Sequence, residues 1–190
     1  MTDFRPEDKI YLTYKTRMTT EARLRRTAFL SYALLTWYSF ILIAFSLLDL
    51  SGRFTISNFS MISATGSIAT FSLSLFIYGE RYSERADHFR NCYLKLQELY
   101  SSDVSSKVKM RKYAEILDQY QNQSDKDYDE MVFDAWWRGQ KLRNAEESIE
   151  ISKSKIWLIG LKRACRFVWL CTLFLIPAIA GIAWFWFNAV

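Results

Sequence analysis

Three stretches of the chain contain no charged residue, and each is long enough to cross a lipid bilayer. They cover residues 27–48, 54–79 and 167–190, which are 22, 26 and 24 residues long. A helix rises about 1.5 Å per residue and needs about 20 residues to span the hydrocarbon core. The sequence therefore predicts an all-α membrane protein with three transmembrane helices.

The spacing of these stretches predicts how the chain is organised. Only residues 49–53 separate the first two, so we expect an N-terminal transmembrane helical hairpin over 27–79 (27–48 and 54–79). A basic amphipathic segment (1–26) precedes it, a polar helical module (80–166) follows it, and a third transmembrane helix (167–190) comes last. No small-residue cleavage site follows the first stretch, so we expect it to stay in the mature protein.

The distribution of Lys and Arg predicts the orientation of the chain in the membrane. Seven of the 25 lie before the first stretch, one lies between the first two, and seventeen lie between the second and third. Loops on the cytoplasmic side are enriched in Lys and Arg. We therefore expect a multi-pass protein with a cytoplasmic N-terminus, a cytoplasmic module over 80–166 and an outer C-terminus.

Motifs of enzymes and metal sites are missing from the sequence. The three cysteines, Cys92, Cys165 and Cys171, have no metal-ligand spacing, and His88 is the only histidine. There is no glycine-rich phosphate loop and no nucleophile elbow. We expect no enzymatic activity, no catalytic residue, no cofactor and no metal.

A heptad-like stripe follows the second apolar stretch directly. Its aromatic and aliphatic members recur at spacings of three and four and are Tyr82, Ala86, Phe89, Tyr93, Leu96 and Tyr100. We expect the second membrane helix to continue through this stripe as a cytoplasmic coupling helix, with Gly79 as the only possible break. Movement of the coupling helix would then reach the membrane directly.

Two more helices are predicted in the cytoplasmic module. One covers 108–120, with Tyr113, Ile116, Leu117 and Tyr120 on one face, and should fold back on the coupling helix. The other begins after Ser124, which precedes Asp127 by three residues in a capping-box pattern. Its apolar residues recur as far as Ile149, so we expect it to run on into the third membrane segment with little interruption.

The second membrane segment carries a face of hydroxyl side chains, which we call the hydroxyl stripe. Its members follow spacings of 3, 4, 3 and 4 and are Ser60, Ser63, Ser67, Thr70 and Ser74. Hydroxyls avoid hydrocarbon, so this face should meet protein or water. Either the stripe packs helices closely through small residues, or copies of the helix surround a weakly selective, wetted pore. The spans contain no charged residue, so coupled ion transport has no support.

Two other features leave alternatives open. Trp37 and Tyr38 lie in the middle of the first segment, where packing between helices is favoured over a ligand cage. A basic cluster, formed by Lys107, Lys109, Arg111 and Lys112, could meet phosphate, although a solvated helix start is the commoner explanation. Direct binding of nucleic acid therefore stays uncertain.

The arrangement resembles a known family. The resemblance rests on the hairpin, on Glu84-Arg85-Ala86-Asp87-His88-Phe89-Arg90-Asn91-Cys92-Tyr93-Leu94-Lys95-Leu96-Gln97-Glu98-Leu99, on Lys112-Tyr113-Ala114-Glu115-Ile116-Leu117, and on Asn122 followed by Asp127-Tyr128. The pattern, over about residues 20–150, is similar to the SLATT family of bacterial two-transmembrane effector domains. Many members carry histidine after the asparagine, where this chain has Gln123. The third segment resembles the branch with an extra C-terminal helix, found beside reverse transcriptases.

The resemblance implies an oligomeric effector of anti-phage defence in the bacterial inner membrane. A partner sensor, a reverse transcriptase or a nucleotide signal would trigger it through its cytoplasmic helices. It would then form a pore or disrupt the membrane, depolarise the cell and cause abortive infection. A different class of function is also open, a passive membrane anchor or scaffold that recruits a cytosolic partner.

Overall fold

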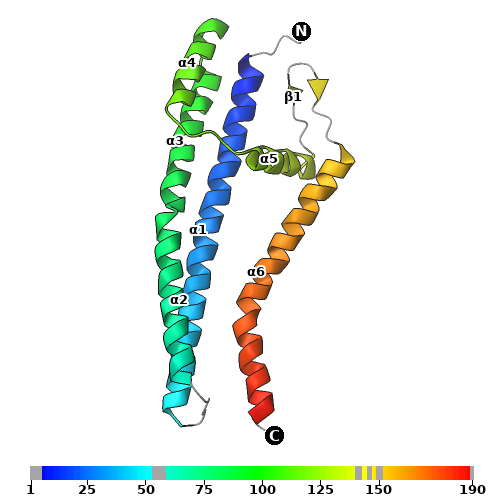
Figure 1. The fold of residues 1–190 in the computed structure, drawn as a ribbon. Coiled ribbons are helices and arrows are strands. Elements are labelled where there is room, and N and C mark those ends of the chain that lie inside the picture. The colour runs from blue at the N-terminus through cyan, green and yellow to red at the C-terminus, as the bar shows by residue number, and fades with distance from the viewer. Residues whose placement is uncertain (1–5, 53–58, 140–142, 145–146, 149–151, 189–190) are drawn as a thin grey trace. The chain divides into compact units, whose positions relative to one another are not determined.

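The chain folds almost entirely into helices (Figure 1). The structure, a computed structural model, describes residues 6–52, 59–139, 143–144, 147–148 and 152–188. In chain order the elements are α1 (Pro6–Leu50), α2 (Phe59–Gly79), α3 (Tyr82–Ser101), α4 (Ser106–Asp118), α5 (Asp125–Trp137), β1 (Arg143–Asn144), β2 (Glu147–Ser148) and α6 (Lys153–Asn188). The two strands pair antiparallel, Arg143 with Ser148 and Asn144 with Glu147.

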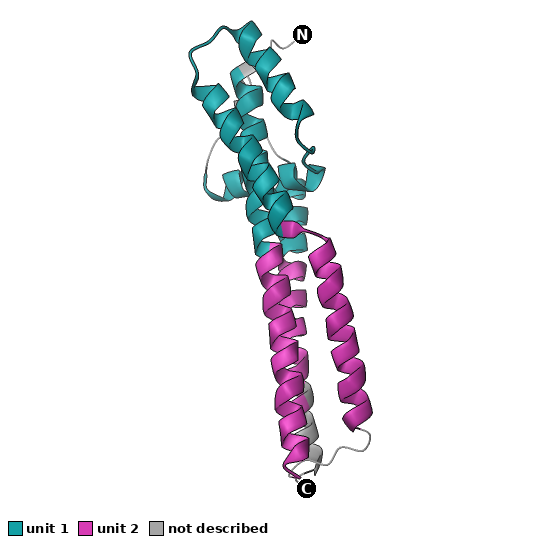
Figure 2. Ribbon diagram, turned by 90° about the vertical axis from the view of Figure 1, so that its left-hand side faces the viewer, with its two compact units in different colours: residues 1–26, 83–163 teal, residues 27–82, 164–190 magenta. Residues whose placement is uncertain are grey.

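The helices form two compact units, coloured separately in Figure 2. Unit 1 contains residues 1–26 and 83–163, and unit 2 contains residues 27–82 and 164–190. Both α1 and α6 contribute one part of their length to each unit. Unit 2 thus collects the predicted membrane segments, and unit 1 collects the regions predicted to be cytoplasmic.

Two helical stretches are long and apolar enough to cross a membrane. They cover Glu7–Leu50 and Phe59–Ser101, and no residue of their apolar windows is buried against the rest of the chain. The prediction of an all-α membrane protein is confirmed. The third predicted segment is helical as far as Asn188 within α6, and its crossing of the membrane stays a prediction. Positions 54–58 and 189–190 of the predicted segments lie outside the described residues.

In unit 2, α1 and α2 form an antiparallel hairpin. Ser46 Oγ lies 3.3 Å from Ser63 Oγ, and Leu42 packs close to Gly66, where an added Cβ would lie 3.1 Å from a Leu42 methyl carbon. As the residue number falls along α1 it rises along α2, which is the signature of antiparallel helices. Gly52, with φ +70°, ends the turn that follows α1 in a conformation that glycine adopts without steric cost.

In unit 1, the core lies between α1, α3 and α4. Ile10, Cys92, Leu96, Leu99 and Tyr113 are buried together. Ile116, Leu117 and Tyr120 pack against this cluster, so the predicted fold-back of the 108–120 helix is confirmed. Of the predicted stripe on α3, Ala86, Phe89 and Leu96 are buried, Tyr82 and Tyr93 are half-buried and Tyr100 is exposed.

The coupling helix is not continuous with the second membrane helix, contrary to the sequence prediction. α2 ends at Gly79 and α3 begins at Tyr82, with a turn at Glu80 and Arg81. Arg81 has φ +50°, in the left-handed region that non-glycine residues rarely adopt. Gly79, named in the sequence analysis as the only possible break, is the last residue of α2, and the turn follows it directly.

The helix expected from 125 to 149 is also shorter than predicted. α5 ends at Trp137, and Gly139 has φ +65°, a conformation that commonly terminates a helix. The chain then forms the β1–β2 pair before α6 begins at Lys153. Apolar periodicity alone did not reveal the end of α5, because the apolar residues recur regularly on both sides of Gly139.

The N-terminal basic segment is part of a longer element. α1 runs from Pro6 to Leu50 without interruption, and its first half supplies Ile10, Thr13, Thr16, Arg17 and Thr20 to the interior of unit 1. The N-terminal part of α1, up to residue 26, thus completes the core of the helical module. The sequence analysis treated 1–26 and 80–166 as separate regions, and the structure groups most of both in one unit.

Candidate functional site

The hydroxyl stripe divides into two parts on α2. Ser63, Thr70 and Ser74 are half-buried, while Ser60 and Ser67 are exposed. Ser63 meets Ser46 of α1, and Gly66 lies beside Leu42 on the same side of α2. One part of the stripe therefore packs against α1, and the other part faces away from the rest of the chain.

Most of the stripe hydroxyls also bond to their own helix. Ser67 Oγ donates to the Ser63 carbonyl at 2.8 Å, Thr70 Oγ1 to the Gly66 carbonyl at 2.8 Å, and Ser74 Oγ to the Phe71 carbonyl at 2.7 Å. Such bonds satisfy a hydroxyl hydrogen in an apolar surrounding. Each oxygen keeps a lone pair for another donor, so the exposed part of the stripe can meet either a polar neighbour or water.

Trp37 and Tyr38 join α1 to α6 within unit 2. Trp37 Nε1 donates to the Phe174 carbonyl at 3.0 Å, and Tyr38 Oη donates to the Leu173 carbonyl at 2.9 Å. The predicted packing of both side chains between helices is confirmed. A second close approach joins the same helices, because a Cβ at Gly181 would lie 2.9 Å from the Phe45 ring.

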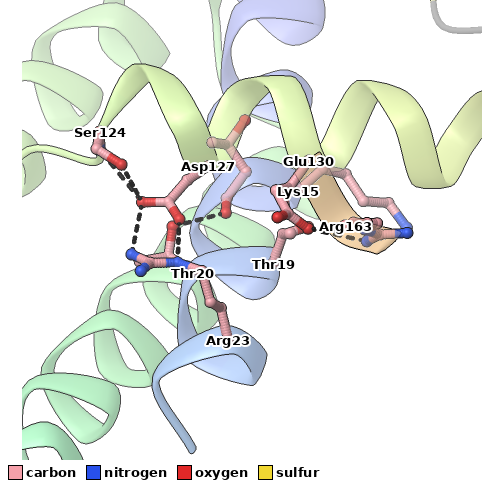
Figure 3. A network of polar contacts seen from close by, with 9 residues as sticks. Lys15, Thr19, Thr20, Arg23, Ser124, Asp127, Glu130 and Arg163 are labelled. Atoms are coloured by element: carbon pink, nitrogen blue, oxygen red, sulfur yellow. Dashed lines mark hydrogen bonds and ion pairs between the residues drawn. The ribbon is translucent and has the colours of Figure 1, made fainter. Parts of the chain in front are cut away.

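Unit 1 contains a polar network centred on Asp127 of α5, drawn in Figure 3. Its side chain is 1% exposed. Arg23 of α1 donates from Nε to Oδ1 at 2.6 Å and from Nη2 to Oδ2 at 3.3 Å. Ser124 donates to Oδ2 from its backbone nitrogen at 3.2 Å and from its hydroxyl at 2.9 Å. The carboxylate thus holds α1 and the start of α5 together, and the predicted capping box is confirmed.

The opposite side of α5 binds α6 through Arg163. Its Nη2 donates to Glu130 Oε2 at 2.9 Å and pairs with Asp134 Oδ1 at 2.7 Å. Its guanidinium also lies 4.7 Å from the centre of the Phe133 ring. Although burial acts to lower it, the hydrogen bonds to the two carboxylates raise the pKa of Arg163. Arg163 therefore remains charged at physiological pH and is available for both pairings.

A third cation, Lys155, completes what we call the α5 clip, the set Arg23–Asp127, Arg163–Glu130/Asp134 and Lys155–Asp129. Lys155 Nζ lies 2.7 Å from Asp129 Oδ1. The hydrogen bond to this carboxylate raises the pKa of Lys155. Below the ion pairs, Phe133 is buried with Ile156 and Ile159 of α6. The 13-residue α5 is thus bound to α1 by one cation and to α6 by two.

Arg17 is a buried cation that the sequence analysis did not single out. It is 0% exposed; its Nε donates to Gln123 Oε1 at 3.2 Å and its Nη1 to the Cys92 thiol. Its Nη2 has no hydrogen-bond partner. Burial raises the pKa of Cys92, against the opposing effect of Arg17, so Cys92 is a neutral thiol. Gln123, which the sequence analysis noted beside Asn122, therefore accepts a hydrogen bond from a buried arginine.

The basic cluster in the first half of α4 does not form a single exposed patch. Lys109 is 6% exposed, and its Nζ lies 3.1 Å from Glu7 Oε1. Arg111 pairs with Glu115 at 3.6 Å, while Lys107 and Lys112 are exposed. A solvated helix start with internal ion pairs thus describes the cluster better than a phosphate site.

The family assignment agrees with this geometry. The sequence matches the family model described as SMODS and SLOG-associating 2TM effector domain family 5 over residues 5–185. Searches of curated proteins and of solved structures find no match. The matched range includes the antiparallel hairpin of unit 2 and the helices of unit 1 that the α5 clip connects. The chain therefore belongs to the SMODS and SLOG-associating two-transmembrane effector domains, and it is a membrane-associated effector of that family.

Proposed function

We propose that this protein is a non-enzymatic, pore-forming effector of a bacterial anti-phage defence system. The observation that carries the proposal is the exposed part of the hydroxyl stripe, Ser60 and Ser67, on a helix that is apolar enough to span a membrane. Hydroxyls on the outer face of a spanning helix are best accommodated by other copies of the helix around a wet axis. Oligomerisation in the inner membrane would supply that axis.

The grouping of residues into units supports the proposed topology. Ile10 of α1 is buried with Cys92 and Leu96 of α3, which supports a topology with the N-terminal segment and the helical module on one side of the membrane. The surplus of Lys and Arg in both regions supports the cytoplasm as that side. With a third crossing by α6, the C-terminus would lie outside.

The α5 clip supports a trigger that acts through the cytoplasmic helices. Asp127 and Arg163 bind α5 to α1 and to α6, and both long helices also contribute residues to unit 2. A partner protein, an associated reverse transcriptase or a nucleotide signal that displaced α5 would release α1 from α6. The released helices could then rearrange in the membrane and depolarise the cell.

Leucine substitutions on two faces of α2 test the proposal. Ser60→Leu with Ser67→Leu changes only exposed stripe positions and leaves the contact between Ser63 and Ser46 intact. Thr65→Leu with Ser72→Leu is the matched control, since both are exposed and lie on the opposite face of the helix. In cells induced to express the chain, a voltage-sensitive dye should report depolarisation by the wild type and by the control pair, and not by the stripe pair. Equal depolarisation by both pairs, at equal membrane insertion, would contradict the proposal; no depolarisation by any form would favour the passive anchor.

A further inference from the structure

Arg17 of α1 is a buried cation whose hydrogen-bond partners are uncharged. It is 0% exposed, and it donates from Nε to Gln123 Oε1 at 3.2 Å and from Nη1 to the Cys92 thiol. Its Nη2 nitrogen, which carries a further pair of N–H groups, has no partner among the described residues. Because Cys92 is a neutral thiol, the guanidinium charge has only neutral partners in the described part of the chain.

A second buried cation in unit 1 shows how such a charge is usually compensated. Among the described residues Arg17 and Lys109 are the two cations that are buried. Lys109 Nζ lies 3.1 Å from Glu7 Oε1 and thus has a carboxylate partner. Glu21, the carboxylate closest to Arg17 in the sequence, lies one turn later on α1 and pairs with Arg25. Arg17 is therefore the buried cation that forms no ion pair with a described carboxylate.

An uncompensated charge at this position opposes the packed form of unit 1, which we call the closed form. Transfer of an ion from water into a protein interior is unfavourable unless an opposite charge and hydrogen bonds compensate for it. Cys92 belongs to the same buried cluster as Ile10 and Leu96, so the guanidinium lies beside the apolar core. An opening that brings water to Arg17 would therefore recover hydration free energy.

The contacts of Arg17 identify the segment whose movement would admit water. Cys92 lies on α3 and is 0% exposed, whereas Gln123 is half-buried in the connection between α4 and α5. The start of α5, directly after this connection, is held to α1 by Arg23 and Asp127. Two arginines of α1 thus act on one region in opposite senses, because Arg23 holds it through a carboxylate and Arg17 favours its opening.

We propose that Arg17 lowers the stability of the closed form of unit 1 and so sets how easily the start of α5 separates from α1. Removal of the charge, or its compensation by a carboxylate, makes this opening rarer. The effect on stability depends on unit 1 alone. Its consequence for depolarisation rests on the proposed function, in which displacement of α5 triggers the effector.

Amide hydrogen exchange of the full chain in lipid nanodiscs tests the effect on stability. A separated helix of 13 residues is marginally stable in water, so exchange of the α5 amides reports how often α5 leaves its partners. Arg17→Met keeps a long, flexible side chain and removes the charge. Exchange in α5 should slow by at least about fivefold, the lower end of the gain when buried charged groups are replaced by apolar ones.

A substitution at Gln123 tests the same idea with the arginine in place. Gln123→Glu replaces the amide oxygen that Arg17 Nε contacts by a carboxylate oxygen in a side chain of nearly the same shape. Exchange in α5 should again slow, because the carboxylate compensates the guanidinium charge. In the Arg17→Met background the same substitution adds a charge without a partner and should speed exchange, so the two changes should be strongly non-additive.

Arg23→Met is the matched control, since it removes the same type of side chain six residues later on α1. It takes the arginine away from the buried carboxylate of Asp127 and should speed exchange in α5. If Arg17 served only to connect α1 to Gln123 and Cys92 by hydrogen bonds, Arg17→Met would speed exchange in the same way. The proposal therefore predicts opposite effects for the two arginines.

The outcomes separate the buried charge from the pore. Unchanged or faster exchange in Gln123→Glu would overturn the proposal, and this result decides the matter even if Arg17→Met does not fold. Slower exchange with weaker depolarisation in Gln123→Glu and Arg17→Met would support the whole proposal. Slower exchange with depolarisation equal to that of the wild type would overturn the link to triggering, whereas failure of the pore itself would appear in the leucine variants of α2.

Discussion

Tyr38 of α1 donates its hydroxyl hydrogen to the backbone carbonyl of Leu173 in α6. This is the carbonyl four residues before Pro177, which lies inside α6. Proline has no backbone N–H, so the Leu173 carbonyl lacks its usual helical donor. In a hydrocarbon surrounding an unpaired carbonyl is costly. The tyrosine therefore satisfies an acceptor that the proline has freed, and it ties α1 to α6 at that point.

A double-mutant cycle should detect this relationship. Tyr38→Phe removes the donor and should destabilise the folded chain by about 0.5–2 kcal/mol, the range of hydrogen bonds between membrane helices. In Pro177→Ala the alanine N–H becomes available to the Leu173 carbonyl, so Tyr38→Phe should then cost less. Unfolding of the purified chain by a denaturing detergent measures each free energy. Equal costs in the two backgrounds would show that the hydrogen bond does not compensate for the proline.

The α5 clip predicts a large difference between two neighbouring carboxylates. Asp127→Asn removes the charge of a carboxylate that is 1% exposed and that pairs with Arg23, whose side chain is 36% exposed, and this change should lower the free energy of unfolding by about 1.5–3 kcal/mol, the range of hydrogen bonds to charged groups. Asp129→Asn removes the pairing with the exposed Lys155 and should cost under about 1 kcal/mol. Circular dichroism during denaturation of the full chain provides both values. Similar losses in the two variants would refute the central role assigned to Asp127.

A cluster of tyrosines in unit 1 predicts alkaline sensitivity. Burial, with contributions from the neighbouring Tyr11 and Tyr100, raises the pKa of Tyr14 to about 12 from an ordinary value of 10.0. Below pH 10 Tyr14 is neutral in both the folded and the unfolded chain. Between pH 10 and 12 it ionises only in the unfolded chain, so stability should fall across that window.

Tyr14→Phe should reduce this loss of stability, since phenylalanine has no proton to release. Tyr128→Phe, on the exposed surface of α5, is the control for removal of a tyrosine hydroxyl. Denaturation midpoints at pH 9 and pH 11 provide the comparison. If Tyr14→Phe and Tyr128→Phe lose stability to the same extent, burial of Tyr14 is not the cause of the sensitivity.

Much of the fold follows from patterns that are local in the sequence. Charge-free length identified the first two membrane segments, the five-residue gap predicted the hairpin, and the spacing of Tyr113, Ile116 and Leu117 predicted how α4 packs. The Ser124–Asp127 spacing located the start of α5. Each of these signals depends on one helix or one turn, so a single sequence is sufficient to read it.

Contacts between distant residues could not be predicted in this way. Nothing near Asp127 in the sequence indicates that Arg23 will reach it, and the seven basic residues of the N-terminal segment looked alike, although Arg17 is buried and Arg25 is exposed. The break at Arg81 was missed because arginine is a good helix former.

Water accessibility of the hydroxyl stripe tests the account most directly. Ser67→Cys and Ser72→Cys place a thiol on the stripe and on the opposite face of α2, in a chain with Cys165 and Cys171 replaced by serine and the buried Cys92 retained. In cells that the chain depolarises, a membrane-impermeant thiosulfonate should modify Ser67→Cys, restore part of the potential and leave Ser72→Cys unmodified. Depolarised cells in which neither thiol reacts, or in which both react alike, would contradict a pore lined by the stripe.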